Sequence, residues 1–158
     1  MTAEASNPPS DNITKVSVLL VEDDELDVLA TRRALRSIAH LIDFHTTSNG
    51  REALDLLRCE EPHLQWPLLI LLDLNMPEMD GFAFLDALRH DAALSLLPVV
   101  VFTTSDREQD IVEAYERHVI GYVRKPLDPT RDQRIVEFLD TYLQTVILPK
   151  DDPRLAPR

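Results

Sequence analysis

Hydrophobic and polar residues form two kinds of segment along this chain. Short, almost continuously apolar runs are typical of strands buried on both faces of a sheet. Such runs lie at Val16–Val21, Pro67–Leu72, Pro98–Thr103 and Ile120–Val123, and a shorter strand is expected at Ile42–Thr46. After each run, apolar residues recur every three or four positions, as on one face of a helix. We therefore predict a doubly wound α/β fold, (βα)5, in which five parallel strands alternate with five helices.

The predicted helices have recognisable starts. A small polar residue with Glu or Gln three positions later resembles a capping box, and such pairs are Asn49 with Glu52, Ser105 with Glu108, and Thr130 with Gln133. We expect the fourth helix to run from Asp106 to about Arg117. The first helix is expected to bury one apolar stripe, which consists of Leu26, Leu29, Ala30, Ala34 and Ile38.

Composition fits one globular domain with tails. The chain has 158 residues, of which 44% are hydrophobic and 28% charged, as is usual for a domain with a proper core. The start is polar and carries Pro8–Pro9, which is typical of a flexible tail. We expect a tail over residues 1–15, the folded domain over residues 16–148, and a second tail or a dimerisation arm over residues 149–158.

Charge and residue usage exclude several classes of function. A formal charge of −12 argues against nucleic acid or an anionic membrane as partner, because both are polyanions. No apolar run is long enough to span a bilayer, and the start does not resemble a signal peptide. The single cysteine, Cys59, cannot form an intramolecular disulfide, which suits a cytoplasmic location. Three glycines in all are too few for a Gly-rich phosphate loop or a dinucleotide fingerprint.

Polar residues follow four of the predicted strands. Each alone can be interpreted as a helix cap or a solvated loop residue, but ligands of parallel α/β sheets bind beyond the carboxyl ends of the strands. The residues at these ends are Glu22 and Asp23, Asp73, Thr103 and Lys125. Together they predict a functional site at one edge of the sheet.

The chemistry of these groups indicates phosphoryl transfer. Three carboxylates that converge on one crevice repel each other, so a cation is expected among them. All the implied ligands are oxygens, which favours Mg²⁺ or Mn²⁺, and the backbone carbonyl of Asn75 can complete the set. Lys125 and Thr103 are suited to bind a phosphoryl group. A carboxylate can accept such a group, so the site is predicted to place one on Asp73.

In these residues the chain resembles a receiver domain of the two-component response regulators, from Val16 to about Ile147. The resemblance implies a flavodoxin-like fold, with Asp73 as phosphoacceptor and Glu22–Asp23 as the metal-binding pair. It further implies that the carbonyl of Asn75 binds the metal, that Thr103 contacts the phosphoryl group and that Tyr122 is the aromatic switch residue. Lys125–Pro126 matches the lysine of the family and its cis peptide bond. Thr104 is either a gate on water that reaches the phosphoryl group or a loop residue.

Stretches such as "LLVEDDELDV" and "YLQTVILP" are similar to one subgroup, the stand-alone regulators that pair with phytochrome-type histidine kinases. The chain departs from that subgroup after the fourth helix, where Arg117–His118–Val119 replaces a Leu-Gly-Ala turn. A glycine adopts the left-handed conformation of such a turn readily, and His118 is expected to adopt it less readily.

The resemblance implies a signalling switch whose only chemistry is its own phosphorylation and dephosphorylation, and which is otherwise not an enzyme. The implied partners are a sensor histidine kinase of the bacteriophytochrome type and a histidine phosphotransfer protein. A homodimer is expected through the last helix and the tail behind it. Ile135, Leu139, Tyr142 and Val146 suffice to cover the core, whereas Phe138, Leu143 and Ile147–Leu148 extend the apolar surface further.

Two alternatives use the same residues differently. A pseudo-receiver would bind partners without phosphorylation, although the complete set of acceptor, acidic pair, hydroxyl and lysine argues against it. A haloacid-dehalogenase-like phosphatase also uses an aspartate at a strand end with Mg²⁺. That family needs a second aspartate two residues later as general acid, and this chain has Asn75 there.

Overall fold

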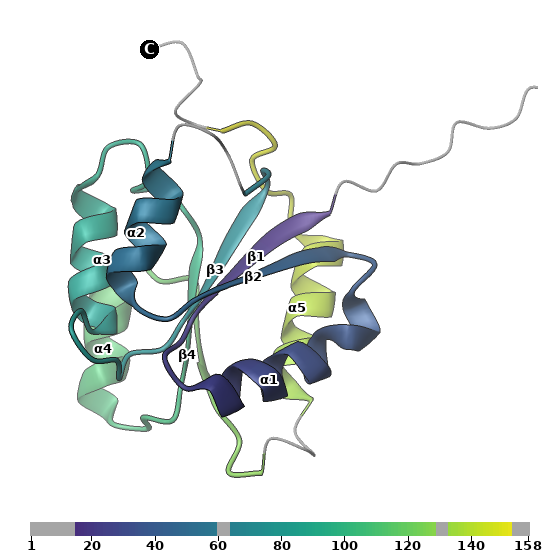
Figure 1. Ribbon diagram of the computed structural model, residues 1–158, viewed down its shortest axis with the longest axis horizontal. Coiled ribbons are helices and arrows are strands. Elements are labelled where there is room, and N and C mark those ends of the chain that lie inside the picture. The colour runs from purple at the N-terminus through teal and green to yellow at the C-terminus, as the bar shows by residue number, and fades with distance from the viewer. Residues whose placement is uncertain (1–14, 60–63, 129–132, 153–158) are drawn as a thin grey trace, which may run out of the picture.

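The computed structural model describes residues 15–59, 64–128 and 133–152, and they form one parallel five-stranded sheet with helices on both faces (Figure 1). The strand order is β2-β1-β3-β4-β5. The elements are β1 (Val16–Val21), α1 (Glu25–Ala34), the 3-10 turn η1 (Leu35–Ile38), β2 (Ile42–Thr47), α2 (Gly50–Arg58), β3 (Leu68–Leu72), α3 (Gly81–His90), β4 (Val99–Thr103), α4 (Glu108–Glu116), β5 (Gly121–Arg124) and α5 (Arg134–Thr145). The predicted fold class is confirmed.

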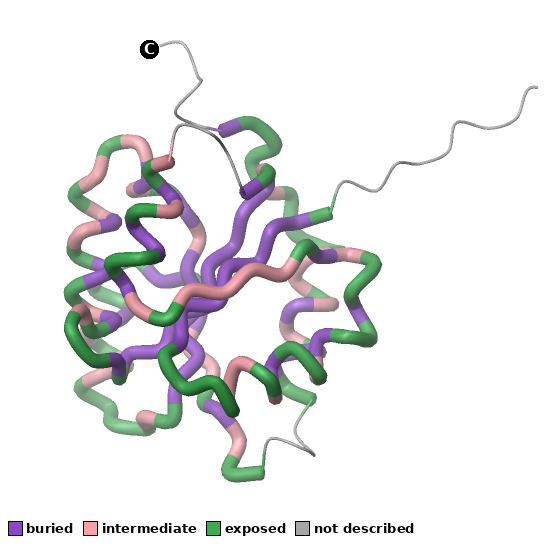
Figure 2. The backbone as a smooth tube through the Cα atoms, in the orientation of Figure 1, coloured by how far each residue is buried: buried purple, intermediate pink, exposed green. Residues whose placement is uncertain are grey.

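The sheet is buried between two helical layers. Helices α2, α3 and α4 cover one face, while α1 and α5 cover the other (Figure 1). Alternate residues of each strand enter the two cores; Leu19 and Val21 of β1 pack on one side, and Val18 and Leu20 on the other. Figure 2 shows the central strands buried and the outer sides of the helices exposed. Burial on both faces explains why the strands are continuously apolar.

The predicted buried stripe of the first helix is partly wrong. Leu26 and Leu29 are 74% and 51% exposed, whereas Ile38 is buried and Ala34 packs partly against the core, as predicted. Thr31 and Leu35, which the predicted stripe omitted, are buried as well. Asp24 begins the helix, because its side chain accepts hydrogen bonds from the backbone N–H groups of Leu26 and Asp27. The helix therefore turns the face through positions 27, 31, 35 and 38 inward, and two of its leucines remain in solvent.

Helix starts differ from the capping-box prediction in detail. Asn49 caps α2 by accepting from the N–H of Glu52, as expected, and the Glu52 carboxylate accepts from the N–H and the hydroxyl of Ser48. Helix α4 begins at Glu108, two residues after the predicted start at Asp106. Its N-cap is Arg107, which makes no capping side-chain hydrogen bond. The Ser105 hydroxyl accepts from the N–H of Arg107 at 3.4 Å and donates to the Asp110 carboxylate at 2.5 Å.

At the last helix, Thr130 lies outside the described residues. Gln133 occupies the cap position of α5 without a side-chain hydrogen bond to the backbone.

In the turn between α4 and β5, His118 adopts the left-handed backbone that a glycine adopts more readily, at φ 57°. The guanidinium of Arg89, on α3, stabilises this turn, because it donates to the carbonyls of Arg117 and His118 at 2.8 and 2.9 Å. The same guanidinium donates to the carbonyls of Ser95 and Leu97, at 2.7 and 2.9 Å. One side chain thus joins α3, the segment before β4 and the turn that precedes β5.

Helix α5 buries more of its apolar surface than predicted. Ile135, Val136 and Leu139 are buried, while Phe138, Tyr142, Leu143 and Leu148 pack partly against the same core. Val146 and Ile147 are 41% and 92% exposed, so Val146 does not belong to the core stripe. Because Leu148 returns to the core, the chain after α5 lies along its own domain at least to this residue.

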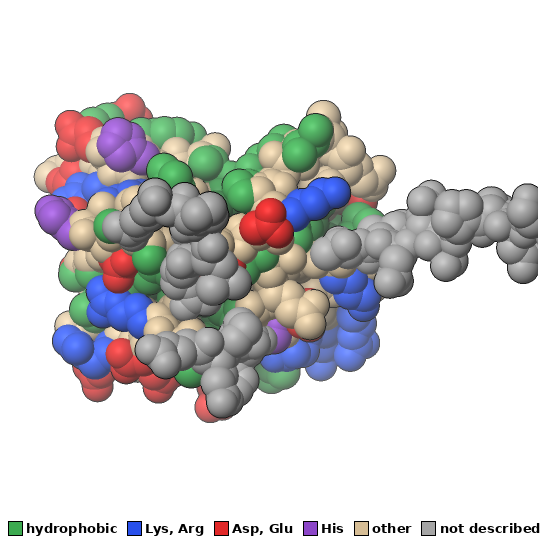
Figure 3. Space-filling view, turned by 90° about the horizontal axis from the view of Figure 1, so that it is seen from above, with side chains coloured by type: hydrophobic (Ala, Val, Ile, Leu, Met, Phe, Trp, Pro, Cys, Tyr) green, Lys and Arg blue, Asp and Glu red, His purple; other side chains and the backbone are tan. Residues whose placement is uncertain are grey.

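None of the helices in the described ranges is long and apolar enough to cross a membrane. On the face shown in Figure 3, hydrophobic side chains are exposed between acidic and basic ones.

Candidate functional site

The predicted site residues meet at the carboxyl edge of the sheet. Glu22, Asp73 and Lys125 each follow a strand directly, and Thr103 ends β4. The backbone ladder continues past the strands, because the N–H of Asp73 donates to the Val21 carbonyl at 3.0 Å and the N–H of Lys125 to the Thr103 carbonyl at 2.7 Å. These bonds fix the backbone at the ends of β1, β3, β4 and β5, from which the site side chains extend.

Three carboxylates form a possible cation site. Glu22, Asp23 and Asp73 each place an oxygen within 4.8 Å of the other two. Glu22 and Asp73 are 3% and 5% exposed, and burial raises the pKa of both carboxyls above their ordinary values. This all-oxygen set suits Mg²⁺ or Mn²⁺. Asn75 lies beside it with an exposed side chain, and the role of its carbonyl stays a prediction.

One nearby charge and two hydrogen bonds partly oppose the effect of burial on the pKa of Asp73. Lys125, the Thr103 hydroxyl and the N–H of Asn75 each act to lower the pKa of this carboxyl, but burial outweighs them. Thr103 is completely buried, and its hydroxyl lies close enough to Asp73 to lower the pKa of that carboxyl. The predicted phosphoryl-binding hydroxyl therefore lies beside the predicted acceptor.

The loop after Asp73 is closely packed. A Cβ atom on Gly81 would lie 2.7 Å from the Asp73 carbonyl oxygen and from the Leu74 Cα, which is closer than any side chain tolerates. The N–H of Gly81 donates to the Leu74 carbonyl at 2.9 Å, and Asp80 caps α3. The Asp80–Gly81 pair thus lets α3 begin directly against the acceptor loop.

Lys125 does not pair mainly with Asp73. Its ammonium contacts the Glu22 carboxylate, lies 2.8 Å from Asp27 Oδ2 and is 3.8 Å from Asp73 Oδ1. Burial lowers the pKa of Lys125, but the hydrogen bonds to Asp27 and Glu22 outweigh it, so the pKa is raised overall. Asp27 was absent from the predicted site. Its signal in the sequence was weak, because one acidic residue in the first turn of a helix usually reflects the helix dipole.

Tyr122, on β5, contacts the segment that follows Thr103. Tyr122 is half-buried, and its hydroxyl donates to the Ser105 carbonyl at 3.1 Å. Burial raises the pKa of this phenol. The ring that was expected to turn inward on phosphorylation is therefore already partly inside.

Two further sequence expectations concern Thr104 and Pro126. Thr104 is exposed. The peptide bond before Pro126 was expected to be cis, and this is wrong: in the described ranges the cis bond is Trp66–Pro67.

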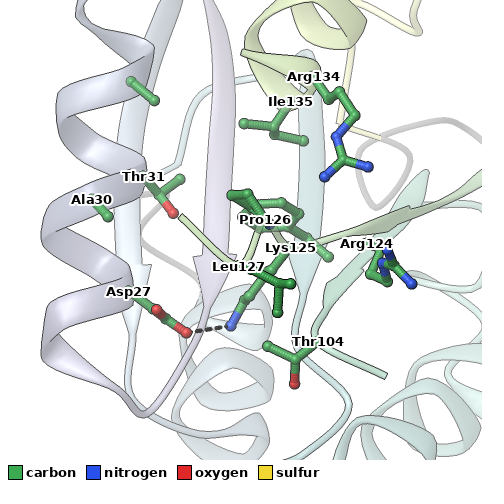
Figure 4. Close-up of a pocket in the computed structure, with 12 residues that line it drawn as sticks. Asp27, Ala30, Thr31, Thr104, Arg124, Lys125, Pro126, Leu127, Arg134 and Ile135 are labelled. Atoms are coloured by element: carbon green, nitrogen blue, oxygen red, sulfur yellow. Dashed lines mark hydrogen bonds and ion pairs between the residues drawn. The ribbon is translucent and has the colours of Figure 1, made fainter. Parts of the chain in front are cut away.

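A cavity of about 280 Å³ lies next to the acidic site, between α1, the end of β5 and the start of α5 (Figure 4). Asp27 and Lys125 line it and point toward one another, while Ala30, Ala34 and Ile135 line its apolar side. The acidic trio itself lies outside this cavity.

The comparisons with known proteins agree with this arrangement. Residues 18–137 match the family model described as the response regulator receiver domain. The chain belongs to this family.

Individual relatives are also similar to this chain along most of its length. The response regulator Rcp1 of Synechocystis sp. (strain ATCC 27184 / PCC 6803 / Kazusa) is 34% identical over 150 residues, which cover 93% of this chain and 98% of Rcp1. The crystal structure of the phosphorylated cyanobacterial phytochrome response regulator RcpA has a TM-score of 0.76 at 33% identity and covers 85% of this chain and 99% of RcpA. A Mn²⁺-bound form of Rcp1 has a TM-score of 0.70 at 34% identity and covers 84% and 98% of the two chains.

Proposed function

We propose that this protein is a phosphoryl-accepting switch and that Asp73 is its acceptor. The observation that carries the proposal is the buried Asp73 carboxylate, which is surrounded by Glu22, Asp23, Thr103 and Lys125 at the carboxyl edge of the sheet. One oxygen of Asp73 forms a bond to phosphorus, and the phosphorus–nitrogen bond to a kinase histidine breaks. The electron pair of that bond remains on the imidazole nitrogen.

The residues around Asp73 would have different roles in phosphoryl transfer. Glu22, Asp23 and Asp73 would hold Mg²⁺ or Mn²⁺, which supplies positive charge against the developing phosphoryl charge. The Thr103 hydroxyl can donate to a phosphoryl oxygen, and the Lys125 ammonium needs to move only from 3.8 Å to hydrogen-bond distance of the acceptor. Burial excludes most water from Asp73, which favours a persistent acyl phosphate.

A phosphoryl group at Asp73 would change the contacts of Thr103 and Tyr122. It adds about −1.5 to −2 charges and strong acceptor oxygens, so the Thr103 hydroxyl moves to it. Tyr122 contacts the same segment through the Ser105 carbonyl. We propose that this pair shifts the population of the α4–β5 surface between two packings.

The kinase partner is proposed from the similarity of this chain to RcpA. RcpA is named as a phytochrome response regulator, so we propose a sensor histidine kinase of the phytochrome type as phosphoryl donor. A histidine phosphotransfer protein is a further candidate partner. The phosphatase alternative gains no support, because the chain belongs to the receiver family and Asn75 stands in place of the second aspartate.

Acetyl phosphate labelling tests the proposal. With Mg²⁺ present, the wild-type chain should gain one phosphoryl group that is labile to base, read by intact-protein mass spectrometry. Asp73→Asn should gain none. Asp55→Asn removes an exposed carboxylate on α2 and should label like the wild type. Comparable labelling of Asp73→Asn would refute the assignment, and an unlabelled wild type would favour the pseudo-receiver.

A further inference from the structure

Lys125 is turned toward helix α1 and away from the proposed acceptor. Its ammonium is within hydrogen-bond distance of Asp27 and Glu22, whereas Asp73 is 3.8 Å away. Figure 4 shows the Lys125 and Asp27 side chains pointing toward one another from the end of β5 and from α1. Lys125 is 7% exposed, so these carboxylates replace most of the water that would otherwise solvate the ammonium.

Both oxygens of Glu22 are already occupied. Oε1 accepts from the backbone N–H of Asp24 at 3.1 Å, and Oε2 accepts from Lys125. A divalent cation that binds Glu22 must therefore share or displace one of these donors. The N–H of Asp24 belongs to the residue that caps α1, so it cannot leave without disturbing the helix start. The ammonium of Lys125 is the donor that can move.

Asp27 offers the ammonium another place. Its Oδ2 lies 2.8 Å from Lys125 Nζ, and its side chain is 35% exposed, so water can solvate the oxygen that Lys125 does not use. The backbone of Asp27 is fixed, because its N–H donates to the Asp24 carboxylate at 3.3 Å. Asp27 can therefore accept a hydrogen bond from Lys125 whether or not Lys125 keeps its contact with Glu22.

We infer that Asp27 is a positioning residue for cation binding: it holds the ammonium of Lys125 when a divalent cation takes over Glu22. The inference rests on the proposed function only in taking Glu22 as a metal ligand. Without Asp27, the ammonium depends on Glu22 alone at hydrogen-bond distance, and the cation competes with it directly. Asp27 acts through Lys125 and does not touch the cation.

Loss of Asp27 could also weaken cation binding for a simpler reason, because any carboxylate near the site attracts a cation. A double-mutant cycle separates the two effects. If Asp27 acts through Lys125, its removal matters only while Lys125 is present. If Asp27 acts as a distant charge, its removal matters equally without the lysine.

The experiment measures Mg²⁺ binding to the full chain by calorimetry, without a phosphoryl donor. We expect Asp27→Asn to weaken binding about two- to five-fold, the range of one partly exposed ion pair. In the Lys125→Gln background the same substitution should change affinity by less than about two-fold. Glu25→Gln removes an exposed charge from the same turn of α1 and should also change affinity by less than about two-fold.

Equal effects of Asp27→Asn in both backgrounds would overturn the inference, as would no effect in either or a wild type that binds no Mg²⁺. Circular dichroism establishes that each variant is folded. If Lys125→Gln does not fold, the ¹⁵N resonance of the Lys125 ammonium decides instead. With Mg²⁺ present, the signal should exchange slowly with water in the wild type and rapidly in Asp27→Asn, and slow exchange in both would reject the role. Labelling of Asp73 does not enter either measurement, so the proposed function can fail or stand separately.

Discussion

At the scale of single residues, the site is a compromise between function and stability. Asp73 and Glu22 are buried carboxylates, and burial alone raises the pKa of each. A buried charge opposes folding unless it is paired, and one ammonium, that of Lys125, is shared among several carboxylates. Without a cation, the acidic site is therefore a locally unfavourable part of the fold.

The first prediction at this scale concerns Asp73 and stability. In a metal-free buffer near neutral pH, Asp73→Asn should raise the melting temperature by about 2–4 °C, which corresponds to about 1 kcal/mol in a chain of this length. A carboxyl whose pKa is higher in the folded than in the unfolded state destabilises the fold when ionised. This cost disappears as pH falls through the raised pKa toward the ordinary value of 3.8.

The advantage of Asp73→Asn should therefore shrink as the buffer is made more acidic. Thermal melts of both proteins in a chelating buffer at several pH values measure it. Asp55→Asn, on the exposed surface, serves as the control. An advantage that is absent at neutral pH, or that grows on acidification, would contradict the argument.

At the scale of elements, the sequence predicted best those features that one strong physical effect determines. Strands buried on both faces must be apolar, so their runs and the polar residues just beyond them were visible in the sequence. Helix phase was less predictable, because Leu26 and Leu29 fit a helical period but remain exposed, while Thr31 and Leu35 are buried in their place. Asp27 was missed for a different reason, since its partner Lys125 is distant in the sequence.

Arg89 is the clearest element-scale connection, and its replacement should be costly. Its guanidinium donates to four backbone carbonyls, those of Ser95, Leu97, Arg117 and His118. Arg89→Met leaves these carbonyls without the donor and should destabilise the protein by about 2–4 kcal/mol. Urea unfolding measures this as a lower midpoint at an unchanged slope.

Arg58→Met is the matched control for Arg89→Met. Arg58 pairs with Asp91 at 3.0 Å on the surface, and loss of such a pair costs about 0–1 kcal/mol. If both substitutions cost the same, the four carbonyls do not depend on Arg89.

At the scale of the whole molecule, the remaining question is self-association. The structure favours a smaller dimer surface than the sequence did, because Phe138, Tyr142 and Leu143 pack partly on their own core and Leu148 returns to it. What remains exposed is Val146 and Ile147, next to a groove lined by Phe138, Tyr142 and Val146. We propose that two copies bury these surfaces against each other, since a two-fold contact is the commonest closed arrangement of identical chains.

Ile147→Glu tests this dimer without removing the segment that packs on the core. Ile147 is 92% exposed, so a charge there should leave the monomer fold intact but should be desolvated in a dimer. We expect light scattering to give twice the chain mass of 18.0 kDa for the wild type and the single mass for Ile147→Glu. Leu96→Glu is the control, because Leu96 is 85% exposed and lies between α3 and β4. A monomeric wild type, or a dimer that Ile147→Glu leaves unchanged, would show that the end of α5 is not the interface.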